Sequence, residues 1–378
     1  MMNILVLGGT GAMGRPLVQI LAQNNHVYVT SRSVRESEGN IIYIQGNAKE
    51  YEFLQQVLNM FMWDAVIDFM VHSEEGLKKN LSLFLDNCKQ YVFISSARVY
   101  AQSEDLIKET TPRLLDVTND KQYLSTNEYA LAKAREEDLL LNSGKKNFTI
   151  IRPSITYNTH RLQLGVLEKE NWLYRALHGR SIVFSEDIND KLTTMTLGDD
   201  VSMGIASIVG QENAYGETFH ITYPESLLWS DVLNIYQNVL REHLGHEVPV
   251  VMTQKSTNLK FKWRIYQVIY SRYFNRTFDN TKIAQYTDIS KFTTPEQGLY
   301  DCLKEFLKNP TFLPISWDLE AVNDRVAKEF TPLREIPRIG NKMTYICYRY
   351  HLEWLLPILN IPVRIINKLK RIFTNGGK

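Results

Sequence analysis

A glycine-rich segment near the start of the chain is the motif most suited to chemistry. Its sequence is Gly8-Gly9-Thr10-Gly11-Ala12-Met13-Gly14, directly after the apolar run Ile4–Leu7 and directly before a helix-length segment. Residues without a Cβ permit a tight turn and a close approach of the backbone to a pyrophosphate, and the N-terminus of the next helix then faces the phosphates. The segment predicts a dinucleotide-binding loop, with a plain glycine turn as the alternative.

A tyrosine and a lysine farther along the chain could move a proton. Tyr129 and Lys133 are four residues apart, so they share one face of an expected helix. A lysine ammonium beside a phenol favours the phenolate, which lets a tyrosine act as acid or base near neutral pH. Ser96 follows the strand-like run Tyr91–Ser95 and could hold the substrate oxygen. Such a Tyr/Lys pair alone is usually a solvated surface feature, but its position after a dinucleotide loop and a serine-bearing strand favours a catalytic site.

The end of the second expected strand bears on the choice of cofactor. The sequence there is Thr30-Ser31-Arg32-Ser33, where an NAD-selective site would usually carry an acidic residue for the ribose 2′-hydroxyl. An arginine with neighbouring hydroxyl groups suits a 2′-phosphate instead. The segment therefore favours NADP over NAD, with an ordinary exposed loop arginine as the alternative.

The elements that must position these residues follow an α/β pattern. Short apolar runs alternate with amphipathic helix-length segments, which is typical of βαβ units around a parallel sheet. The pattern predicts a Rossmann-type doubly wound parallel sheet over residues 1–155, of about six or seven strands. We expect a smaller, mixed substrate-binding lobe over 156–330, with an isolated strand at Phe219–Thr222, and a basic helical extension over 331–378.

Composition narrows the class of protein. The formal net charge of +1 gives no general field that would attract nucleic acid, so no nucleic-acid partner is expected. The three cysteines are far apart and show neither a disulfide pattern nor metal-ligand spacing, so we expect no metal and a reducing, cytoplasmic location. The first residues also lack the basic and apolar regions of a signal peptide.

In the order of these motifs, residues 1–222 resemble the extended short-chain dehydrogenases/reductases, in the NAD-dependent epimerase/dehydratase family that acts mainly on nucleotide sugars. The resemblance implies that Tyr129 is the catalytic acid/base, with Ser96 and Lys133 as its catalytic partners. It also implies that Arg152-Pro153-Ser154 lies near the nicotinamide. Together with the segment around Arg32, the expected cofactor-binding residues are Gly8, Thr10, Gly11, Ala12, Met13, Gly14, Ser31, Arg32, Ser33, Asn47, Phe69, Lys133, Pro153 and Ser154.

Two departures from the family pattern narrow the reaction. Family dehydratases carry an acidic pair directly after the catalytic Ser/Thr, where this chain has Ala97 and Arg98, so a dehydratase is disfavoured. Asn47 stands where the family commonly has an aspartate near the adenine. Cations in the later loop and helix could pair with a substrate diphosphate, or could be surface residues. The candidate substrate contacts are Ser96, Arg98, His160, Arg161, Gln163 and Arg175.

The expected function is that of an NAD(P)-dependent nucleotide-sugar epimerase or ketoreductase. Tyr129 would exchange the hydroxyl proton while a hydride passes to or from the nicotinamide. An epimerase takes the hydride back on the other face of a keto intermediate, whereas a reductase releases oxidised cofactor. Arg32 favours the reductase, because cellular NADP is mostly reduced. The alternative is a non-catalytic cofactor-sensing or RNA-associated protein of the same fold, against which the near-neutral charge and the complete Ser/Tyr/Lys set argue.

The last stretch of the chain, Lys342–Lys378, is both basic and apolar. Pro357, Pro362 and the interleaved cations break its apolar runs too often for a membrane span, which needs about 20 mostly apolar residues. One alternative is a peripheral helix in the surface of an anionic membrane, where each cation contributes about 1 kcal/mol. The other is a helix that packs onto the protein's own lobe or across a homodimer interface.

Overall fold

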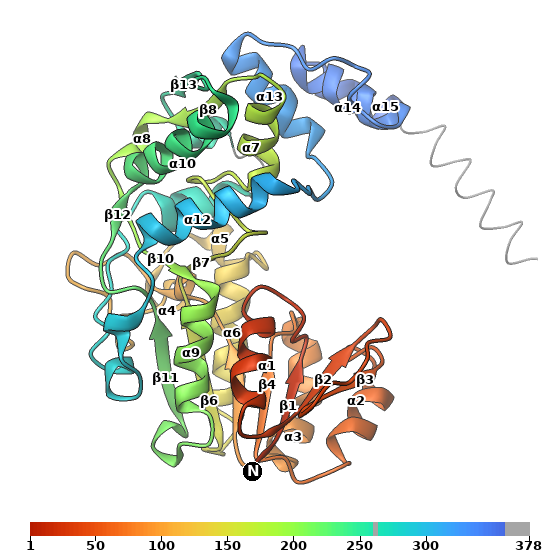
Figure 1. Ribbon diagram of the computed structural model, residues 1–378, viewed down its shortest axis with the longest axis vertical. Helices are drawn as coiled ribbons and strands as arrows, with labels where there is room; N and C mark the ends of the chain where they lie inside the picture. Colours follow the sequence, from red (N-terminus) through yellow and green to blue (C-terminus); the bar gives the residue numbers. More distant parts are fainter. Residues whose placement is uncertain (260–263, 360–378) are drawn as a thin grey trace, which may run out of the picture.

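The computed structural model describes residues 1–259 and 264–359, which form two lobes and a helical extension (Figure 1). The N-terminal lobe is built on seven parallel strands in the order β11-β6-β5-β4-β1-β2-β3. This order confirms the predicted doubly wound sheet. The strands are β1 (Asn3–Leu7), β2 (His26–Ser31), β3 (Ile41–Gln45), β4 (Ala65–Asp68), β5 (Tyr91–Ile94), β6 (Phe148–Pro153) and β11 (Glu217–Ile221).

Helices cover both faces of this sheet, which is why its central strands are nearly continuous apolar runs. Every residue of β4, β5 and β6 is buried. One face packs against α1 (Gly14–Ala22) and α9 (Gly198–Ile208), whose Leu17 and Ile205 belong to the same apolar cluster. The helices of the other face are α2 (Tyr51–Leu58), α3 (Glu74–Asp86) and α6 (Tyr129–Leu141).

One part of the expected substrate lobe belongs to the sheet instead. The segment 198–221 supplies α9 and β11, and β11 pairs in parallel with β6 from Glu217 opposite Thr149 to Ile221 opposite Pro153. The strand predicted at Phe219–Thr222 is therefore not isolated. Its partner lies more than sixty residues earlier in the chain, so local sequence could not reveal the pairing. The N-terminal lobe consequently includes residues beyond 155.

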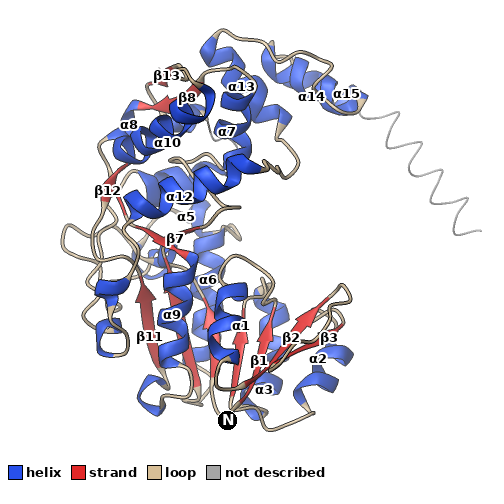
Figure 2. Cartoon of the chain, in the orientation of Figure 1, coloured by secondary structure: helices blue, strands red, loops and turns tan. Residues whose placement is uncertain are grey.

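The second lobe lies over the carboxyl ends of the strands (Figure 2). Its core buries large side chains, among them Trp172 and Tyr236, whose rings stack with their centroids 4.5 Å apart. The elements of this lobe include α7 (Lys169–Leu177), the parallel pair β8 (Ile182–Ser185) and β13 (Val250–Thr253), α10 (Trp229–Leu244), α12 (Pro295–Lys308) and α13 (Trp317–Ala327).

The other strands and α-helices of the described chain are mostly short. The remaining strands are β7 (Ile155–Tyr157), which pairs with β10 (Met195–Leu197), and β9 (Leu192–Thr193), which pairs with β12 (Leu227–Leu228). The remaining α-helices are α4 (Leu114–Val117), α5 (Lys121–Leu124), α8 (Glu186–Asn189), α11 (Ile265–Gln267), α14 (Ile339–Arg349) and α15 (Leu356–Leu359).

The C-terminal extension begins as a helix packed on the protein. Residues Tyr345, Cys347 and Tyr348 of α14 are buried, and α14 lies against α13. The basic and apolar residues 360–378, on which the membrane and dimer alternatives depend, lie outside the described residues. Within residues 1–259 and 264–359, no helix combines the length and the hydropathy needed to cross a bilayer.

Candidate functional site

The loop between β1 and α1 forms a cradle for a pyrophosphate. Gly8 has a φ of +71°, and a Cβ on Gly14 would lie 2.6 Å from the Cα of Gly9, so these positions require glycine. No side chain caps α1, because its N-cap residue Met13 makes no side-chain hydrogen bond. At the start of α1 the Arg15 N–H already donates to the Gly11 carbonyl oxygen at 3.1 Å and Pro16 has no N–H, so the Gly14 N–H is the helical donor left to face an anion. A Cβ on Gly11 would meet nothing within 4 Å, so this side of the loop is open to a ligand.

A cavity of about 300 Å³ adjoins this loop at the ends of β2 and β3. Gly8, Ser31, Arg32 and Asn47 line it, as the sequence predicts for the adenosine end of a dinucleotide. Lys49, which the sequence analysis did not single out, lines it too. No Asp or Glu is among the described residues that line the cavity. The cavity therefore presents two cations and no carboxylate to a ribose.

Three predicted cofactor contacts have local roles or lie beside the cavity: Asn47, which also lines it, Ser33 and Phe69. The Asn47 amide donates to Glu50 at 3.1 Å and accepts from the Lys49 N–H at 3.2 Å, so it shapes the turn before α2. Ser33 offers its carbonyl oxygen to the Ser31 hydroxyl at 2.9 Å. Phe69 follows β4, but its neighbour Met70 is the residue that lines the cavity.

A second cavity of about 300 Å³ lies above the carboxyl ends of β5 and β6 and brings the predicted catalytic residues together. Ser96 and Tyr129 line it, and they are 33 positions apart in the sequence. Met13 of the glycine loop lines the same cavity, as do Pro153 and Ser154. The predicted nicotinamide contacts Pro153 and Ser154 therefore share one space with Ser96 and Tyr129, whereas the third predicted catalytic residue, Lys133, does not line it.

The local fold determines how Ser96 and Tyr129 are presented to a ligand in this cavity. Ser96 lies two residues after β5 and caps the short helical turn Ala97–Val99, where its hydroxyl oxygen accepts the Arg98 N–H at 3.2 Å. Because the oxygen accepts this bond, the hydroxyl hydrogen remains available to a ligand. Tyr129 is the first residue of α6 and is 42% exposed. The Arg98 guanidinium lies 5.5 Å from the centre of its ring and pairs with Glu128.

Lys133 lies one turn farther along α6 but is buried beneath the cavity. Its ammonium donates to Glu136 at 2.8 Å and lies 4.5 Å from the centre of the Phe93 ring. Both members of this ion pair are almost completely buried. The structure thus fixes a cation on the helix that carries Tyr129 and gives it a carboxylate partner that the sequence analysis did not name.

A second buried pair lies next to Lys133 and Glu136. His72 and Asp68 are 2.7 Å apart, and the Tyr91 hydroxyl donates to the same Asp68 oxygen at 2.7 Å. Burial opposes the charged forms, but the attraction between the two groups prevails, so the pKa of His72 is raised and that of Asp68 is lowered. This pair stabilises the end of β4, where the chain turns towards α3.

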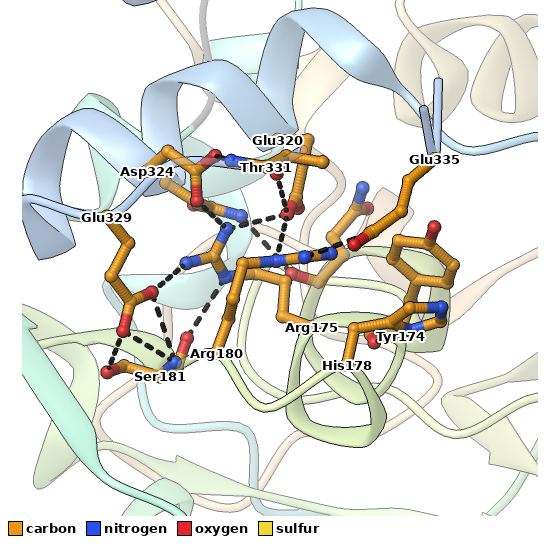
Figure 3. Close-up of polar contacts among 12 residues, drawn as sticks. Tyr174, Arg175, His178, Arg180, Ser181, Glu320, Asp324, Glu329, Thr331 and Glu335 are labelled. Carbon is orange, nitrogen blue, oxygen red and sulfur yellow. Dashed lines mark hydrogen bonds and ion pairs between the residues drawn. The ribbon is translucent and has the colours of Figure 1, made fainter. Parts of the chain in front are cut away.

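Arg175 is not a substrate contact, which corrects the sequence analysis. It is fully buried on α7 and lines neither of these cavities, and Figure 3 shows its polar contacts. Its guanidinium donates to Glu320 and Asp324 at 2.7 Å each and to Glu329 at 2.8 Å. These acids come from α13 and the loop after it, about 145 residues away. With every guanidinium nitrogen hydrogen-bonded inside the protein, Arg175 holds the second lobe together.

The other predicted substrate residues separate between two spaces. Arg98 and Gln163 line the catalytic cavity, whereas His160 lines a neighbouring cleft of about 880 Å³ between the glycine loop and the second lobe. Arg161 lines both. The cleft is also lined by Thr10, Gly11 and Arg15, so it continues from the pyrophosphate cradle.

The sequence analysis missed a group of residues that completes the catalytic cavity. The segment after α11 contributes Ser271, Arg272, Arg276 and Phe278. Arg272 and Arg276 are only 5% and 7% exposed. No spacing motif marks them, since they come from an irregular connection more than 130 residues after Tyr129. Their type and burial become informative only when the fold is known.

Comparison with protein families agrees with this geometry. The model of the NAD dependent epimerase/dehydratase family matches residues 4–191, which include the glycine loop, Ser96, Tyr129 and Lys133. The chain belongs to this family. The resemblance inferred from the motifs is thereby confirmed.

Two curated relatives of this epimerase/dehydratase chain have names that describe different activities. The chloroplast stem-loop binding protein of 41 kDa b of Arabidopsis thaliana is 25% identical over 239 residues, which cover 58% of each chain. A UDP-glucose 4-epimerase of Lacticaseibacillus casei is 29% identical over 136 residues, which cover 30% of this chain and 41% of that one. The chain thus spans 58% and 41% of the length of these relatives.

Solved structures share the fold of this family member. A dTDP-glucose 4,6-dehydratase from Bacillus anthracis, in complex with NAD, superposes with a TM-score of 0.59 at 18% identity, over 82% of this chain and 97% of that one. A UDP-glucuronic acid 4-epimerase from Bacillus cereus, in complex with UDP-glucuronic acid and NAD, has a TM-score of 0.57 at 17% identity, over 81% and all of the respective chains. At such identities the likeness shows the fold.

Proposed function

We propose that the protein is an NAD(P)-dependent enzyme that acts on a nucleotide sugar as an epimerase or a ketoreductase. The observation that carries the proposal is the single cavity that Ser96, Tyr129, Met13 and Pro153 line together. Membership of the epimerase/dehydratase family supports it. The names of the relatives and neighbours that act on UDP-linked or dTDP-linked sugars support the substrate class.

The chain's own residues supply the proton chemistry. The Tyr129 phenol, at the exposed start of α6, gives a proton to the substrate oxygen or takes one from it. The Ser96 hydroxyl holds that oxygen, because its own oxygen is already anchored by the Arg98 N–H. Lys133 provides a fixed positive charge one helical turn from Tyr129, positioned by Glu136. A bound nicotinamide cofactor supplies or accepts the hydride.

The position of the cations favours NADP as this cofactor. Arg32 and Lys49 line the cavity at the end of β2, and no carboxylate is among its described lining residues. A ribose 2′-phosphate would meet two positive charges there, whereas the 2′-hydroxyl of NAD would lack the acidic acceptor that NAD-selective sites usually provide. A reductase that draws on NADPH follows from this choice, with the epimerase as the alternative.

The test uses the full chain with UDP-glucose, whose sugar carries hydroxyl groups and no ketone, and with a 4-keto nucleotide sugar, which a reductase can reduce. Stoichiometric loss of the absorbance of NADPH or NADH identifies a reductase, and a new sugar epimer without such loss identifies an epimerase. Tyr129→Phe removes the transferable proton and keeps the ring, so turnover falls by about 10²-fold or more. Tyr300→Phe, which removes a hydroxyl bound to Glu242 on the surface of the second lobe, leaves turnover unchanged. Full activity of the Tyr129 variant would exclude the proposed chemistry.

A second candidate is an RNA-associated protein, and the stem-loop binding relative is the observation that favours it. The chain lacks the positive charge on which most RNA binding depends, with a formal net charge of +1. An electrophoretic mobility assay with a stem-loop RNA, at low and at physiological salt, decides the matter. Submicromolar binding at physiological salt favours this candidate, and binding only at low salt counts against it.

A further inference from the structure

Arginines surround the catalytic cavity without any acidic counterpart. Arg98, Arg161, Arg272 and Arg276 line it, and no Asp or Glu is among its described lining residues. Near it, Glu128 pairs with Arg98, and Glu168 accepts from the Gln163 amide at 3.1 Å and acts on Arg272 through its charge. The four guanidiniums therefore exceed the two nearby carboxylates, and the cavity has an excess of positive charge.

Arg272 and Arg276 are held only by neutral acceptors. Arg272 donates to the carbonyl of Gly165 at 3.0 Å, to the hydroxyl of Ser271 at 2.9 Å and to the amide of Gln163 at 3.3 Å. Arg276 donates to three backbone carbonyls, those of Tyr100, Ala101 and Tyr270. These bonds fix both guanidiniums in place but leave their charges without a counter-ion.

Two arginine nitrogens at this cavity also lack any acceptor. The Nε atoms of Arg276 and Arg98 are buried and have no hydrogen-bond partner among the described residues. A buried donor left unsatisfied costs roughly 1–3 kcal/mol, and more when the group is charged. Both nitrogens belong to residues that line the same space, so one ligand with acceptor oxygens could satisfy them.

Among the residues that the structure describes, neither Arg272 nor Arg276 has a carboxylate as a direct partner. Among residues 1–259 and 264–359, neither Arg272 nor Arg276 forms an ion pair with an Asp or a Glu. The segments 260–263 and 360–378 contain no Asp or Glu in the sequence. Within the described residues Glu168 attracts Arg272 without forming an ion pair, so both guanidiniums remain available for a direct ion pair with a bound anion.

The electrostatic state of the two arginines agrees with this. Burial, together with repulsion from Arg98, Arg276 and Arg161 and against the pull of Glu168, lowers the pKa of Arg272 to about 9. Burial, together with repulsion from Arg98, lowers the pKa of Arg276 to about 10. The pKa values of both arginines are thus lowered by the positive charge of Arg98, which lines the same cavity.

We propose that the substrate is a nucleotide-linked acidic sugar, whose own carboxylate binds Arg272 and Arg276 beside the carbon that Tyr129 serves. The inference rests on the proposed function. The carboxylate belongs here because the arginines share a cavity with Ser96 and Tyr129, and guanidinium groups match carboxylate oxygens in geometry and charge. The adjoining cleft of about 880 Å³ leaves room for the rest of the ligand, and Arg161 lines both spaces.

The experiment measures binding, so it does not depend on turnover. The full chain, saturated with NADPH, is titrated in a calorimeter with UDP-glucuronic acid and with UDP-glucose, which differ only in the carboxylate. We expect the acid to bind at least about tenfold more tightly, a difference of about 1.4 kcal/mol. An affinity for the acid no greater than that for the neutral sugar, including no binding of either, overturns the inference.

Variants separate the sugar carboxylate from the diphosphate. Arg272→Gln and Arg276→Gln should remove the tenfold preference and leave the affinity for UDP-glucose within about threefold, whereas Arg241→Gln, an exposed arginine on α10, should change neither. Equal losses for both sugars would assign the arginines to the diphosphate and overturn the inference. Arg272→Lys, which keeps the charge, should retain part of the preference and serves if the glutamine variants fold poorly. Preferential binding of the acid without any turnover would instead refute the proposed function and leave the acid site standing.

Discussion

Two regions of this protein contain buried arginines, and they differ in whether carboxylates compensate the positive charge. In the second lobe, Arg175 and Arg180 are surrounded by Glu320, Asp324, Glu329 and Glu335 (Figure 3). In the catalytic cavity, Arg272 and Arg276 meet only carbonyl, hydroxyl and amide oxygens. The arginines of the first region have carboxylate partners within the chain, although Arg180 Nη2 and Glu320 Oε2 there lack a hydrogen-bond partner. Arg272 and Arg276 form no ion pair among the described residues.

This contrast teaches how to tell a structural cation from a binding one. A buried charge is costly unless it is paired, so a stable fold normally supplies the partner itself. Arg175, which the sequence analysis took for a substrate contact, has its partners within the chain. Arg272, which the sequence analysis overlooked, has none among the described residues. Burial alone does not distinguish the two, but the presence of carboxylates does.

The largest effect should come from breaking the paired cluster. Arg175→Met leaves the carboxylates of Glu320 and Asp324 buried without their shared donor, so we expect the free energy of unfolding to fall by about 3–5 kcal/mol. Urea denaturation followed by circular dichroism measures it. Arg241→Met, at an exposed site, should change the stability by less than about 0.5 kcal/mol. A loss below about 1 kcal/mol for Arg175→Met would contradict a structural role.

A smaller effect is expected at the exposed cations of the other cavity. Arg32 forms no ion pair among the described residues and lines the space at the end of β2 with Lys49. Arg32→Ala should weaken the binding of NADPH by about 1.5–3 kcal/mol, because bonds to a charged phosphate are lost. The affinity for NADH should change much less. Fluorescence titration of both cofactors gives the ratio, and equal weakening would exclude recognition of a 2′-phosphate.

The smallest effect should follow from removing an unpaired arginine. Arg272→Met loses hydrogen bonds to Gly165 and Gln163 but also removes a buried cation without a counter-ion, and these contributions oppose each other. We expect the free energy of unfolding to change by less than about 1 kcal/mol in the ligand-free protein. The same urea denaturation applies. A cost as large as that of Arg175→Met would show that Arg272 is structural and would remove the contrast.

Much of the cofactor lobe could be predicted because its signals are local. The glycine loop needs residues without a Cβ at spacings set by one tight turn, and Tyr129 and Lys133 share a face because of the helical repeat. The apolar run Ile4–Leu7 and the strand-like run Tyr91–Ser95 agree with β1 and β5 to within a residue. Buried strands are recognised as apolar runs since both faces of the sheet are covered.

The sequence by itself therefore determined the fold class, the glycine cradle and the order of Ser96, Tyr129 and Lys133, which are properties of neighbouring residues. Only the tertiary structure decided which arginines are placed to bind a ligand and which pair with carboxylates inside the second lobe. Arg175 meets Glu320 across 145 positions, and Arg276 meets Tyr100 across 176. The return of β11 to β6 was decided in the same way. Charge compensation and strand pairing act between segments that the chain brings together only on folding, so no local spacing encodes them.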